Sequence, residues 1–243
     1  MINLLSNFKG KKVIITGHTG FKGSWLTIWL LHLGAKIIGI SNGIPTKPSN
    51  FESNQLKKKI NHQNFDIKNK IKLQRLINIH KPDFIFHLAA QSLVKKSYAK
   101  PSLTFETNSF GTLTLLDVLK DYKIKKICSV VIITSDKSYK NLELNRGYKE
   151  DDLLGGHDPY SASKACAELI IQSYFSSFLI KNKNLKISVA RAGNVIGGGD
   201  WSENRLIPDC IKSIKNKKKL LIRFPNSTRP WQHVFKPFMA TCY

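Results

Sequence analysis

The sequence predicts an α/β protein built on a doubly wound, Rossmann-like parallel sheet. Residues 12–16 form an apolar β-branched run, a glycine-rich turn follows, and residues 21–33 carry helical apolar spacing. Gly34 then stands where a helix C-cap is expected, and a second β-branched run covers residues 35–41. A strand, helix, strand unit of this kind implies parallel strands, because parallel neighbours need a crossover connection.

The same alternation continues along the chain. Further strands are predicted at residues 64–67, 84–88, 127–134 and 186–191. In a doubly wound sheet, ligands bind at the carboxyl ends of the strands. The segments 42–54 and 140–158 are too long for simple connections, so both are predicted to border the active site.

Composition indicates a soluble globular enzyme. The chain has 243 residues, of which 42% are hydrophobic, enough for one core and part of a second lobe. No stretch approaches the roughly 18 apolar residues of a membrane span, and the first residues lack a signal peptide's apolar region. We therefore expect a cytoplasmic protein without a membrane partner. Four dispersed cysteines and seven scattered histidines predict neither a disulfide framework nor a metal site.

Net charge is the one extreme property. A formal charge of +23 raises nucleic-acid binding as an alternative function. The basic residues are nevertheless spread along the whole chain, and six arginines stand against 33 lysines, a poor ratio for bidentate phosphate recognition. We interpret the charge as a lysine-rich surface and expect no nucleic-acid partner.

The glycine-rich turn has the spacing of a dinucleotide site. Gly17, Gly20 and Gly23 give G-x-x-G-x-x-G between a strand and a helix. The first glycine permits the turn, the second lets the backbone approach a pyrophosphate, and the third lets helix pack on strand. The alternative is a merely structural turn. The whole predicted cofactor loop comprises Gly17, His18, Thr19, Gly20, Phe21, Lys22 and Gly23.

A Tyr-x-x-x-Lys pair supplies a candidate proton carrier. Tyr160 and Lys164 lie one helical turn apart, and Asp158 with the following proline marks the start of that helix. A phenol with a pKa near 10 is a poor base at neutral pH, but a neighbouring ammonium stabilises the phenolate. Tyr122 and Lys126 form a second such pair, which we interpret as chance in so lysine-rich a chain.

Three polar residues follow the apolar run that ends at Thr134. Ser135, Asp136 and Lys137 place a hydroxyl, a carboxyl and an amine at the carboxyl end of a strand. Such a combination suits proton transfer. The alternative for this tripeptide is an ordinary polar turn.

Six segments together resemble the CDP-glucose 4,6-dehydratases, which are extended short-chain dehydrogenase/reductases. They are GHTGFKGSWL, HLAAQSLV, TSDKSY, GGHDPYSASKACAEL, RAGNVIGGGDW and RPWQHV, spread from about residue 10 to residue 234. The glycine motif and the Tyr-x-x-x-Lys pair are shared widely, whereas TSDK, GNVIGGGDW and RPWQHV narrow the choice. Related dehydratases carry glutamate at the position of Lys137.

The resemblance implies that NAD oxidises the sugar transiently at C4. Tyr160 would take the proton of the 4-hydroxyl, Ser135 would bond the same oxygen, and Lys164 would hold the nicotinamide ribose. Lys137 would then remove the C5 proton while Asp136 protonates the departing C6 hydroxyl. For that step Lys137 must be neutral, so we expect its pKa to be depressed by burial or by the Lys164 charge.

The resemblance also implies binding residues and an overall organisation. Further cofactor contacts are expected from Asp66, Ile67, Leu88, Ala89, Ala90, Gln91 and Asn108, besides Tyr160 and Lys164, and sugar-nucleotide contacts from Asn194, Arg205, Leu206, Ile207 and Arg229. Residues 1–191 would form the NAD-binding domain, and residues 192–243 an incomplete substrate-binding lobe. Helices over residues 102–122 and 159–178 would pair in a homodimer.

Two departures from the family pattern bear on these expectations. No acid follows the second strand, where Ser41 and Asn42 stand, so we expect NADP to be tolerated beside NAD, with Lys22 and His18 as partners of its extra phosphate. The family also extends about a hundred residues beyond RPWQHV. The alternatives that remain are a non-catalytic remnant that binds dinucleotide only, and another nucleotide-sugar epimerase or dehydratase.

Overall fold

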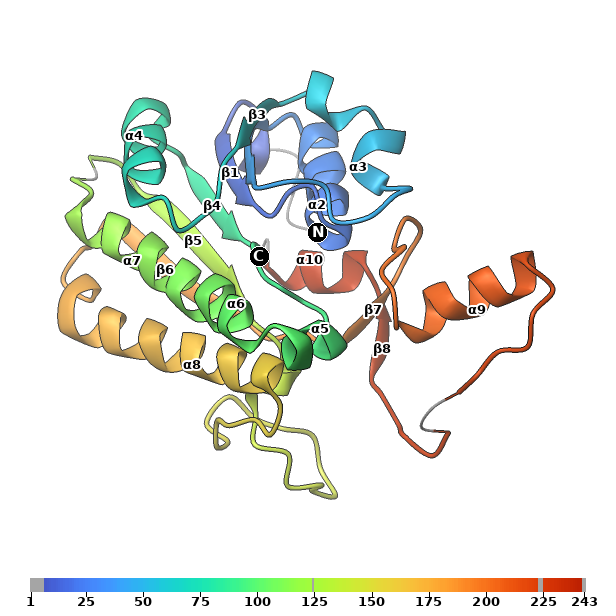
Figure 1. Cartoon of the computed structure of the whole chain (residues 1–243). Helices are drawn as coiled ribbons and strands as arrows, with labels where there is room; N and C mark the ends of the chain where they lie inside the picture. The colour runs from blue at the N-terminus through green and yellow to red at the C-terminus, as the bar shows by residue number, and fades with distance from the viewer. Residues whose placement is uncertain (1–6, 124, 223–224, 242–243) are drawn as a thin grey trace.

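A computed structural model describes residues 7–123, 125–222 and 225–241 and contains a six-stranded parallel sheet (Figure 1). The strand order is β3-β2-β1-β4-β5-β6, which confirms the doubly wound arrangement. The strands are β1 (Lys12–Thr16), β2 (Lys36–Ser41), β3 (Asn61–Asn64), β4 (Phe84–His87), β5 (Cys128–Ile133) and β6 (Leu185–Ala190).

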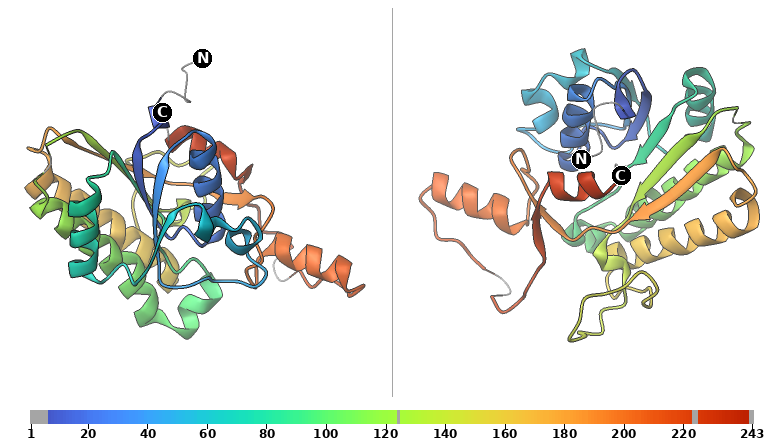
Figure 2. Two further views of the ribbon diagram at one scale, coloured as in Figure 1. Left: turned by 90° about the horizontal axis from the view of Figure 1, so that it is seen from above. Right: turned by 180° about the vertical axis from the view of Figure 1, so that it is seen from behind.

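Helices cover both faces of this sheet. They are α2 (Phe21–His32), α3 (Asn50–Ser53), α4 (Lys70–His80), α5 (Val94–Ala99), α6 (Pro101–Phe105), α7 (Gly111–Asp121), α8 (Pro159–Tyr174), α9 (Leu206–Lys215) and α10 (Phe235–Thr241), with short turns η1 (Leu56–Lys58), η2 (Glu106–Phe110), η3 (Asp136–Ser138) and η4 (Phe175–Leu179). Helices α4, α7 and α8 pack on one face, and α2 and α10 on the other (Figure 2). None of the helices in the described ranges is both long and apolar enough to span a bilayer.

The two faces bury separate cores. Along β1, Ile14 points into the cluster shared with α4, α7 and α8, whereas Val13 and Ile15 point into the cluster shared with α2. Successive side chains of a strand face opposite sides, so a strand buried on both sides must be apolar throughout. This requirement explains why the β1 sequence KVIIT was recognisable as a strand with its observed bounds.

The position predicted for the third strand was wrong. We expected residues 64–67, but β3 spans Asn61–Asn64 and pairs only with β2, from Ile38 opposite Asn61 to Ser41 opposite Asn64. A strand at the edge of a sheet forms backbone hydrogen bonds without burying its side chains. The polar sequence NHQN can therefore form β3. The apolar residues that suggested a strand, Phe65 and Ile67, instead pack against the core from the segment that follows.

The last fifty residues leave the sheet and then return to it. Strands β7 (Asn194–Ile196) and β8 (Trp231–His233) form a small parallel pair, and α9 projects away from the main body (Figure 2). Val234 and Phe238 are nevertheless buried in the core cluster that contains Val13 and Leu26. The division at residue 192 stays a prediction, and part of the second segment completes the core of the first.

Candidate active site

The turn between β1 and α2 is packed so closely that glycine is required. Gly17 has a φ of 74°, and a Cβ there would lie 2.8 Å from the Ala89 nitrogen. A Cβ on Gly23 would overlap the Gly17 carbonyl oxygen. Gly20 is the N-cap of α2 and offers no side-chain cap, and the first turn of α2 carries no acidic residue. The N–H groups at the start of α2 therefore suit an anionic ligand such as a pyrophosphate.

The side chains of His18 and Thr19 support this turn from within the protein. His18 is fully buried, its Nε2 lies 2.8 Å from His62 Nδ1, and its ring occupies the space that a Cβ on Gly39 would need. Burial lowers the pKa of His18 to about 4, so the ring is neutral at neutral pH. Thr19 Oγ1 lies 2.7 Å from Ser41 Oγ and ties the turn to the end of β2. Only the backbone of these two residues remains for a ligand.

Lys22 lies near the proposed catalytic groups, whose charges act on its pKa. Burial and the charges of Arg205 and Lys137 lower the pKa of Lys22 to about 8. The carboxylates of Asp136 and Asp200 act in the opposite direction. The His18 ring is buried and is not exposed to a 2′-phosphate. The role of Lys22 as a partner of that phosphate stays a prediction.

The segment after β4 forms a second wall beside the glycine turn. Thr16 Oγ1 accepts hydrogen bonds from the backbone nitrogens of Leu88 and Ala89, at 3.2 and 3.1 Å. Ala90 is partly exposed, and Gln91 is buried. The predicted cofactor residues of this segment are therefore brought against β1.

The Asn108 side chain supports the segment after β4 through hydrogen bonds to the backbone of Gln91. Its Oδ1 accepts a hydrogen bond from the Gln91 nitrogen at 2.8 Å, and its Nδ2 donates to the Gln91 oxygen and to Ser163 Oγ. The side chain is buried and links the Gln91 segment to α8. The Asn108 side chain thus supports the Gln91 segment, and the cofactor contact expected of Asn108 stays a prediction.

Asp66 lies just beyond β3, at the ligand-binding edge of the sheet. Its Oδ1 accepts a hydrogen bond from the Lys68 nitrogen at 2.9 Å, and Asn42 Nδ2 donates to Oδ2 at 3.2 Å. Ile67 is buried against Gly111. The hydrogen bond between Asn42 and Asp66 thus links the ends of β2 and β3, where the resemblance implies that the adenine of the cofactor binds.

The tripeptide after β5 forms the polar centre of the site. Lys137 Nζ lies 3.1 Å from Asp136 Oδ1 and donates to Asn194 Oδ1 at 3.2 Å. Ser135 Oγ donates to Asp136 Oδ1 at 3.1 Å. Ser135 caps the short 3₁₀ turn η3 by accepting a hydrogen bond from the Lys137 nitrogen, which holds the segment just beyond the strand end. These linked contacts favour a site over an ordinary polar turn, and the roles of the three residues stay predictions.

Helix α8 carries the Tyr-x-x-x-Lys pair into the same centre. Asp158 caps the helix by accepting hydrogen bonds from the nitrogens of Tyr160 and Ser161, at 3.0 and 3.1 Å. Burial raises the pKa of Tyr160, and a hydrogen bond with Ser135 and the charge of Arg205 oppose that rise. In this structure, therefore, Arg205 supplies positive charge that favours the phenolate.

Lys164 is buried one turn beyond Tyr160. Its Nζ donates to the Ile133 oxygen at 3.3 Å. Burial and the Lys22 charge lower the pKa of Lys164 to about 8, and the Glu168 charge acts in the opposite direction. A small change in the surrounding charge can therefore change the protonation of Lys164 near neutral pH.

The predicted substrate residues divide into two groups. Asn194 contacts Lys137, and Arg205 bonds Asp200 Oδ2 at 2.9 Å and Ser92 Oγ at 3.0 Å, so both belong to the polar centre. Leu206 and Ile207 begin α9, with Leu206 exposed. Arg229 is exposed and donates to the neighbouring Thr228 oxygen, and its contact with the sugar nucleotide stays a prediction.

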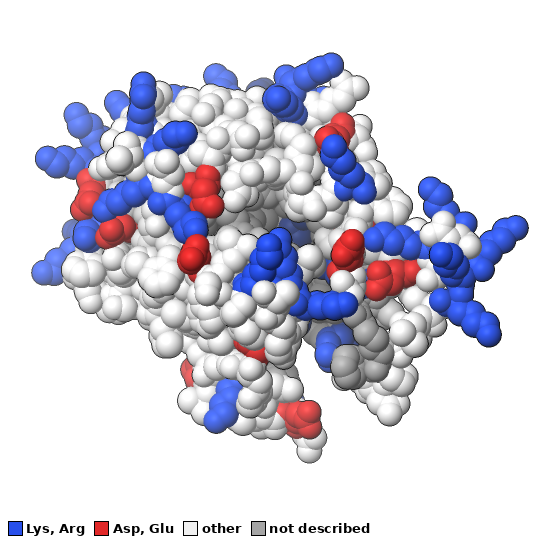
Figure 3. All heavy atoms as spheres, viewed as in Figure 1, with Lys and Arg blue, Asp and Glu red and all other residues white. Residues whose placement is uncertain are grey.

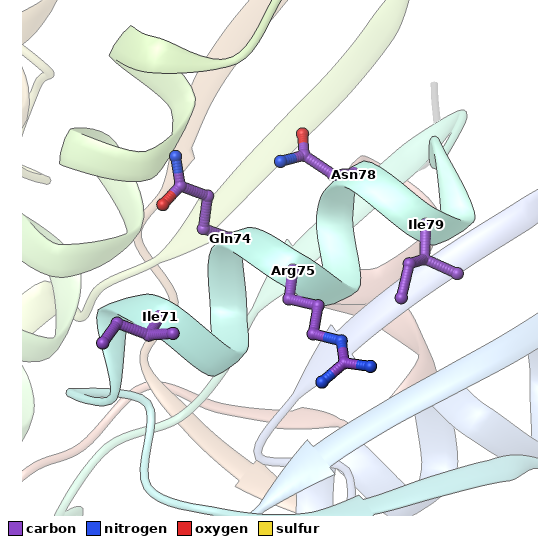
Figure 4. A pocket seen from close by; sticks show the side chains of 5 residues that line it. All are labelled: Ile71, Gln74, Arg75, Asn78 and Ile79. Atoms are coloured by element: carbon purple, nitrogen blue, oxygen red, sulfur yellow. The ribbon is translucent and has the colours of Figure 1, made fainter.

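Two surface features lie apart from the site. A shallow hollow on α4 is lined by Ile71, Gln74, Arg75, Asn78 and Ile79 (Figure 4), and none of these belongs to the predicted set. On the face drawn in Figure 3, lysine and arginine side chains are scattered among acidic ones and gather toward the end that carries α9. The scattering fits a lysine-rich surface better than a single continuous nucleic-acid groove.

Comparison with known proteins decides the family. Residues 14–236 match the family model described as GDP-mannose 4,6 dehydratase. The chain belongs to this family. It is 46% identical over 234 residues to the CDP-glucose 4,6-dehydratase of Salmonella typhimurium, covering 95% of this chain and 65% of the relative. The dTDP-D-glucose 4,6-dehydratase of Dictyostelium discoideum is 33% identical, covering 87% and 50%.

The fold of this dehydratase-family chain is similar to that of a Streptomyces venezuelae dTDP-glucose 4,6-dehydratase, whose structure has NAD and TYD bound. Its TM-score is 0.80 at 25% identity, and the match covers 95% of this chain and 70% of that one. The resemblance indicated by the motifs and the Rossmann-like fold are thus both confirmed. The chain spans 65% or less of the length of the two curated relatives.

Sequence reasoning about this dehydratase-family chain missed Glu168 and Arg191. Arg191 donates to both carboxylate oxygens of Glu168 at 2.7 Å, directly behind the polar centre. One signal was present: Glu168 follows Tyr160 and Lys164 at intervals of four, so all three share a helix face. Nothing in the sequence placed Arg191, 23 residues further on, against that face.

Proposed function

We propose that the chain dehydrates CDP-D-glucose to CDP-4-keto-6-deoxy-D-glucose with NAD as its cofactor. The observation that carries the proposal is the Asp136–Lys137 pair, at 3.1 Å, beside the Ser135 and Tyr160 hydroxyls. An acid and a base in contact, next to a group that can accept a hydroxyl proton, are what a combined oxidation and elimination requires. The similarity to the Salmonella CDP-glucose 4,6-dehydratase supports CDP-glucose as the substrate.

The fit for a dinucleotide rests on the glycine turn. A Cβ would fill the close approach at Gly17 and Gly23, and the uncapped start of α2 presents N–H groups for a pyrophosphate. The backbone from His18 to Lys22 would hold the phosphates, Asp66 the adenine end and Lys164 the nicotinamide ribose. NAD, when bound, supplies an acceptor for the C4 hydride and returns a hydride to C6.

Tyr160 and Ser135 act on the sugar 4-hydroxyl. The phenolate oxygen of Tyr160 accepts the hydroxyl proton, and Ser135 Oγ bonds the same oxygen and orients it. Because burial raises the pKa of Tyr160, the phenolate needs nearby positive charge, and Arg205 provides it. Loss of this proton turns the C4 oxygen into a carbonyl as the C4 hydride departs.

Asp136 and Lys137 act on the elimination. The elimination requires a base that takes the C5 proton and an acid that protonates the C6 hydroxyl. Lys137 Nζ and Asp136 Oδ1 lie 3.1 Å apart, so the two groups can exchange a proton directly. Lys137 then takes the C5 proton, made acidic by the adjacent ketone, and Asp136 gives its proton to the leaving C6 hydroxyl as water.

The other polar residues would hold the sugar nucleotide. Asn194 already bonds Lys137 and orients its amine, and Arg205 has a planar fork suited to a phosphate oxygen. Leu206 and Ile207 would line the entrance at the start of α9. Arg229 is exposed and directly precedes Pro230, whose oxygen accepts a hydrogen bond from the Asn194 nitrogen, and it would contact a phosphate of the sugar nucleotide.

The test is direct. The protein is mixed with NAD and CDP-glucose, and the 4-keto product is read by its absorbance in alkali, with Tyr160→Phe as the inactive control. Product from wild type alone supports the proposal. Cofactor binding without product would identify a dinucleotide-binding remnant, and inversion at C4 without loss of water would identify an epimerase.

We also propose that the reaction takes place in the cytoplasm, where it would supply deoxysugar synthesis for surface polysaccharide such as O-antigen.

We further propose a homodimer through α7 and α8, supported by the exposed apolar side chains of Phe110, Leu169 and Phe178 on and beside these helices. Light scattering tests the assembly, and a monomeric mass would contradict it.

A further inference from the structure

Glu168 is a buried carboxylate that the proposed reaction does not use. Its side chain is 2% exposed and lies on α8, one turn beyond Lys164. Oε1 accepts hydrogen bonds from Thr134 Oγ1 at 2.6 Å and from Arg191 Nε at 2.7 Å, and Oε2 accepts one from Arg191 Nη2 at 2.7 Å. Ser138 Oγ adds a longer contact of 3.3 Å to Oε1.

The hydroxyls that bond Glu168 flank the catalytic tripeptide. Thr134 directly precedes Ser135, and Ser138 directly follows Lys137. Ser138 has one hydroxyl hydrogen and shares it with the Ser135 oxygen at 2.7 Å, so Thr134 makes the stronger link to Glu168. One carboxylate therefore holds both ends of the segment that carries the proposed acid and base.

Glu168 also belongs to the other half of the site. Tyr160, Lys164 and Glu168 follow one another at intervals of four on α8, so they share one face of a rigid helix. The carboxylate thus joins the helix that acts on the 4-hydroxyl to the strand end that acts on C5 and C6. Elimination has to follow oxidation on one bound sugar, which requires these two halves to keep a fixed separation.

Arg191 fixes the orientation of the Glu168 carboxylate. Besides its two bonds to Glu168, its Nη1 donates to the Glu150 oxygen at 2.9 Å, and its guanidinium lies 4.6 Å from the centre of the Tyr139 ring. Buried ion pairs often add less stability than apolar residues of the same volume would. An apolar side chain at position 168 could not accept the directional hydrogen bonds from Thr134 and Ser138.

We propose that Glu168 is a positioning residue, whose carboxylate fixes the segment from Ser135 to Lys137 relative to Tyr160 and Lys164. The inference rests on the proposed function for its kinetic consequences but not for its structural ones. Glu168→Gln keeps the shape and replaces one acceptor by an amide donor, which faces Arg191 or Thr134 as a second donor. Glu168→Asp keeps the charge on a shorter stem.

The kinetic arm compares these variants with Glu106→Gln, which makes the same chemical change in an exposed ion pair with Lys68. For Glu168→Gln we expect kcat to fall at least tenfold while KM changes less than threefold, and for Glu168→Asp a partial recovery. Thr134→Val removes the stronger donor and leaves the Glu168–Arg191 pair in place. It should reproduce most of the loss, and wild-type kcat in both Thr134→Val and Glu168→Gln would overturn the proposal.

The pH profile provides a readout that a purely structural role would not move. Lys164 is faced by Lys22 on α2, by His87 on β4 and by Glu168 on its own helix. Glu168 raises the pKa of Lys164 against burial and the Lys22 charge, so its neutralisation lowers that pKa further. The ammonium is then lost at lower pH, and the alkaline limb of kcat should shift to lower pH in Glu168→Gln but not in Glu168→Asp.

Hydrogen exchange tests the positioning without turnover. In the 243-residue chain, Glu168→Gln should speed exchange in a peptide covering residues 134–139, where the Thr134 and Asp136 nitrogens bond the Ala190 and Ala192 oxygens, and leave β1 unchanged. Unchanged exchange in that peptide, in this variant and in Thr134→Val, would overturn the positioning role. Absence of product from wild type would instead contradict the proposed function, whatever the exchange shows.

Discussion

Replacing Lys137 separates the oxidation from the elimination. Lys137 contacts Asp136 at 3.1 Å and Asn194 at 3.2 Å, and its side chain is 31% exposed. At that exposure the ion pair contributes little to stability, about 0.5 kcal/mol, so Lys137→Ala should fold and bind NAD as wild type does. A general base contributes roughly 10²–10⁴-fold in rate, or about 3–5 kcal/mol of barrier, and the variant loses it in the C5 step alone.

Lys137→Arg sharpens this prediction, because arginine keeps the positive charge beside Asp136 but cannot act as a base. Both variants should oxidise the sugar once and stop, so enzyme-bound NADH accumulates and is read by its absorbance in stopped flow. Lys72→Ala, an exposed lysine on α4, is the matched control. Full product formation by Lys137→Arg, with no NADH signal, would refute the assignment of Lys137 as base.

Four further predictions follow from the geometry. Tyr160→Phe should abolish oxidation at C4 and leave the NAD dissociation constant, measured by calorimetry, within about threefold of wild type, or roughly 0.7 kcal/mol; unchanged turnover would contradict the role. Gly23→Ala places a Cβ onto the Gly17 carbonyl oxygen and should destabilise the fold by about 1–3 kcal/mol in urea unfolding, with weaker NAD binding. Because Ser41 rather than an acid ends β2, NADP should bind within about tenfold of NAD, roughly 1.4 kcal/mol, and a thousandfold preference for NAD would end that idea. Lys22→Met removes a charge that lowers the pKa of Lys164, so the alkaline limb of kcat should move to higher pH; a shift to lower pH would show that Lys22 acts elsewhere.

The elements that could be predicted from the sequence are those whose residues are determined by contacts close in the chain or by burial on both faces of the sheet. β1 was placed with its observed bounds because a strand buried on both faces must be apolar at every position. The glycine turn was predictable for a related reason, since its spacing reflects backbone contacts within a few residues. The edge strand β3 has no such constraint on its side chains, and the apolar residues beyond it gave a misleading signal.

Site residues could be predicted where a motif determines the backbone position. The contacts of long side chains could not be predicted, because they depend on the packed structure. Ser135, Asp136 and Tyr160 converge because a strand end and a helix start are placed by the fold. Lys22 lies in the predicted loop, but the sequence did not show that the charges of Arg205 and Asp136 act on its pKa. The Glu168–Arg191 contact joins residues 23 positions apart and exists only once β6 is packed beside α8.

The central claim is that Lys137 and Asp136 remove water from a sugar that has been oxidised at C4. Running the reaction with CDP-glucose and NAD in deuterium oxide tests it most directly, with the product read by NMR. The hydride returned to C6 comes from C4, whereas the C5 proton taken by Lys137 exchanges with solvent. The account therefore predicts a 6-deoxy-4-keto product with one deuterium at C5 and none in the C6 methyl group. Recovery of CDP-glucose unchanged, or deuterium in the methyl group, would contradict it.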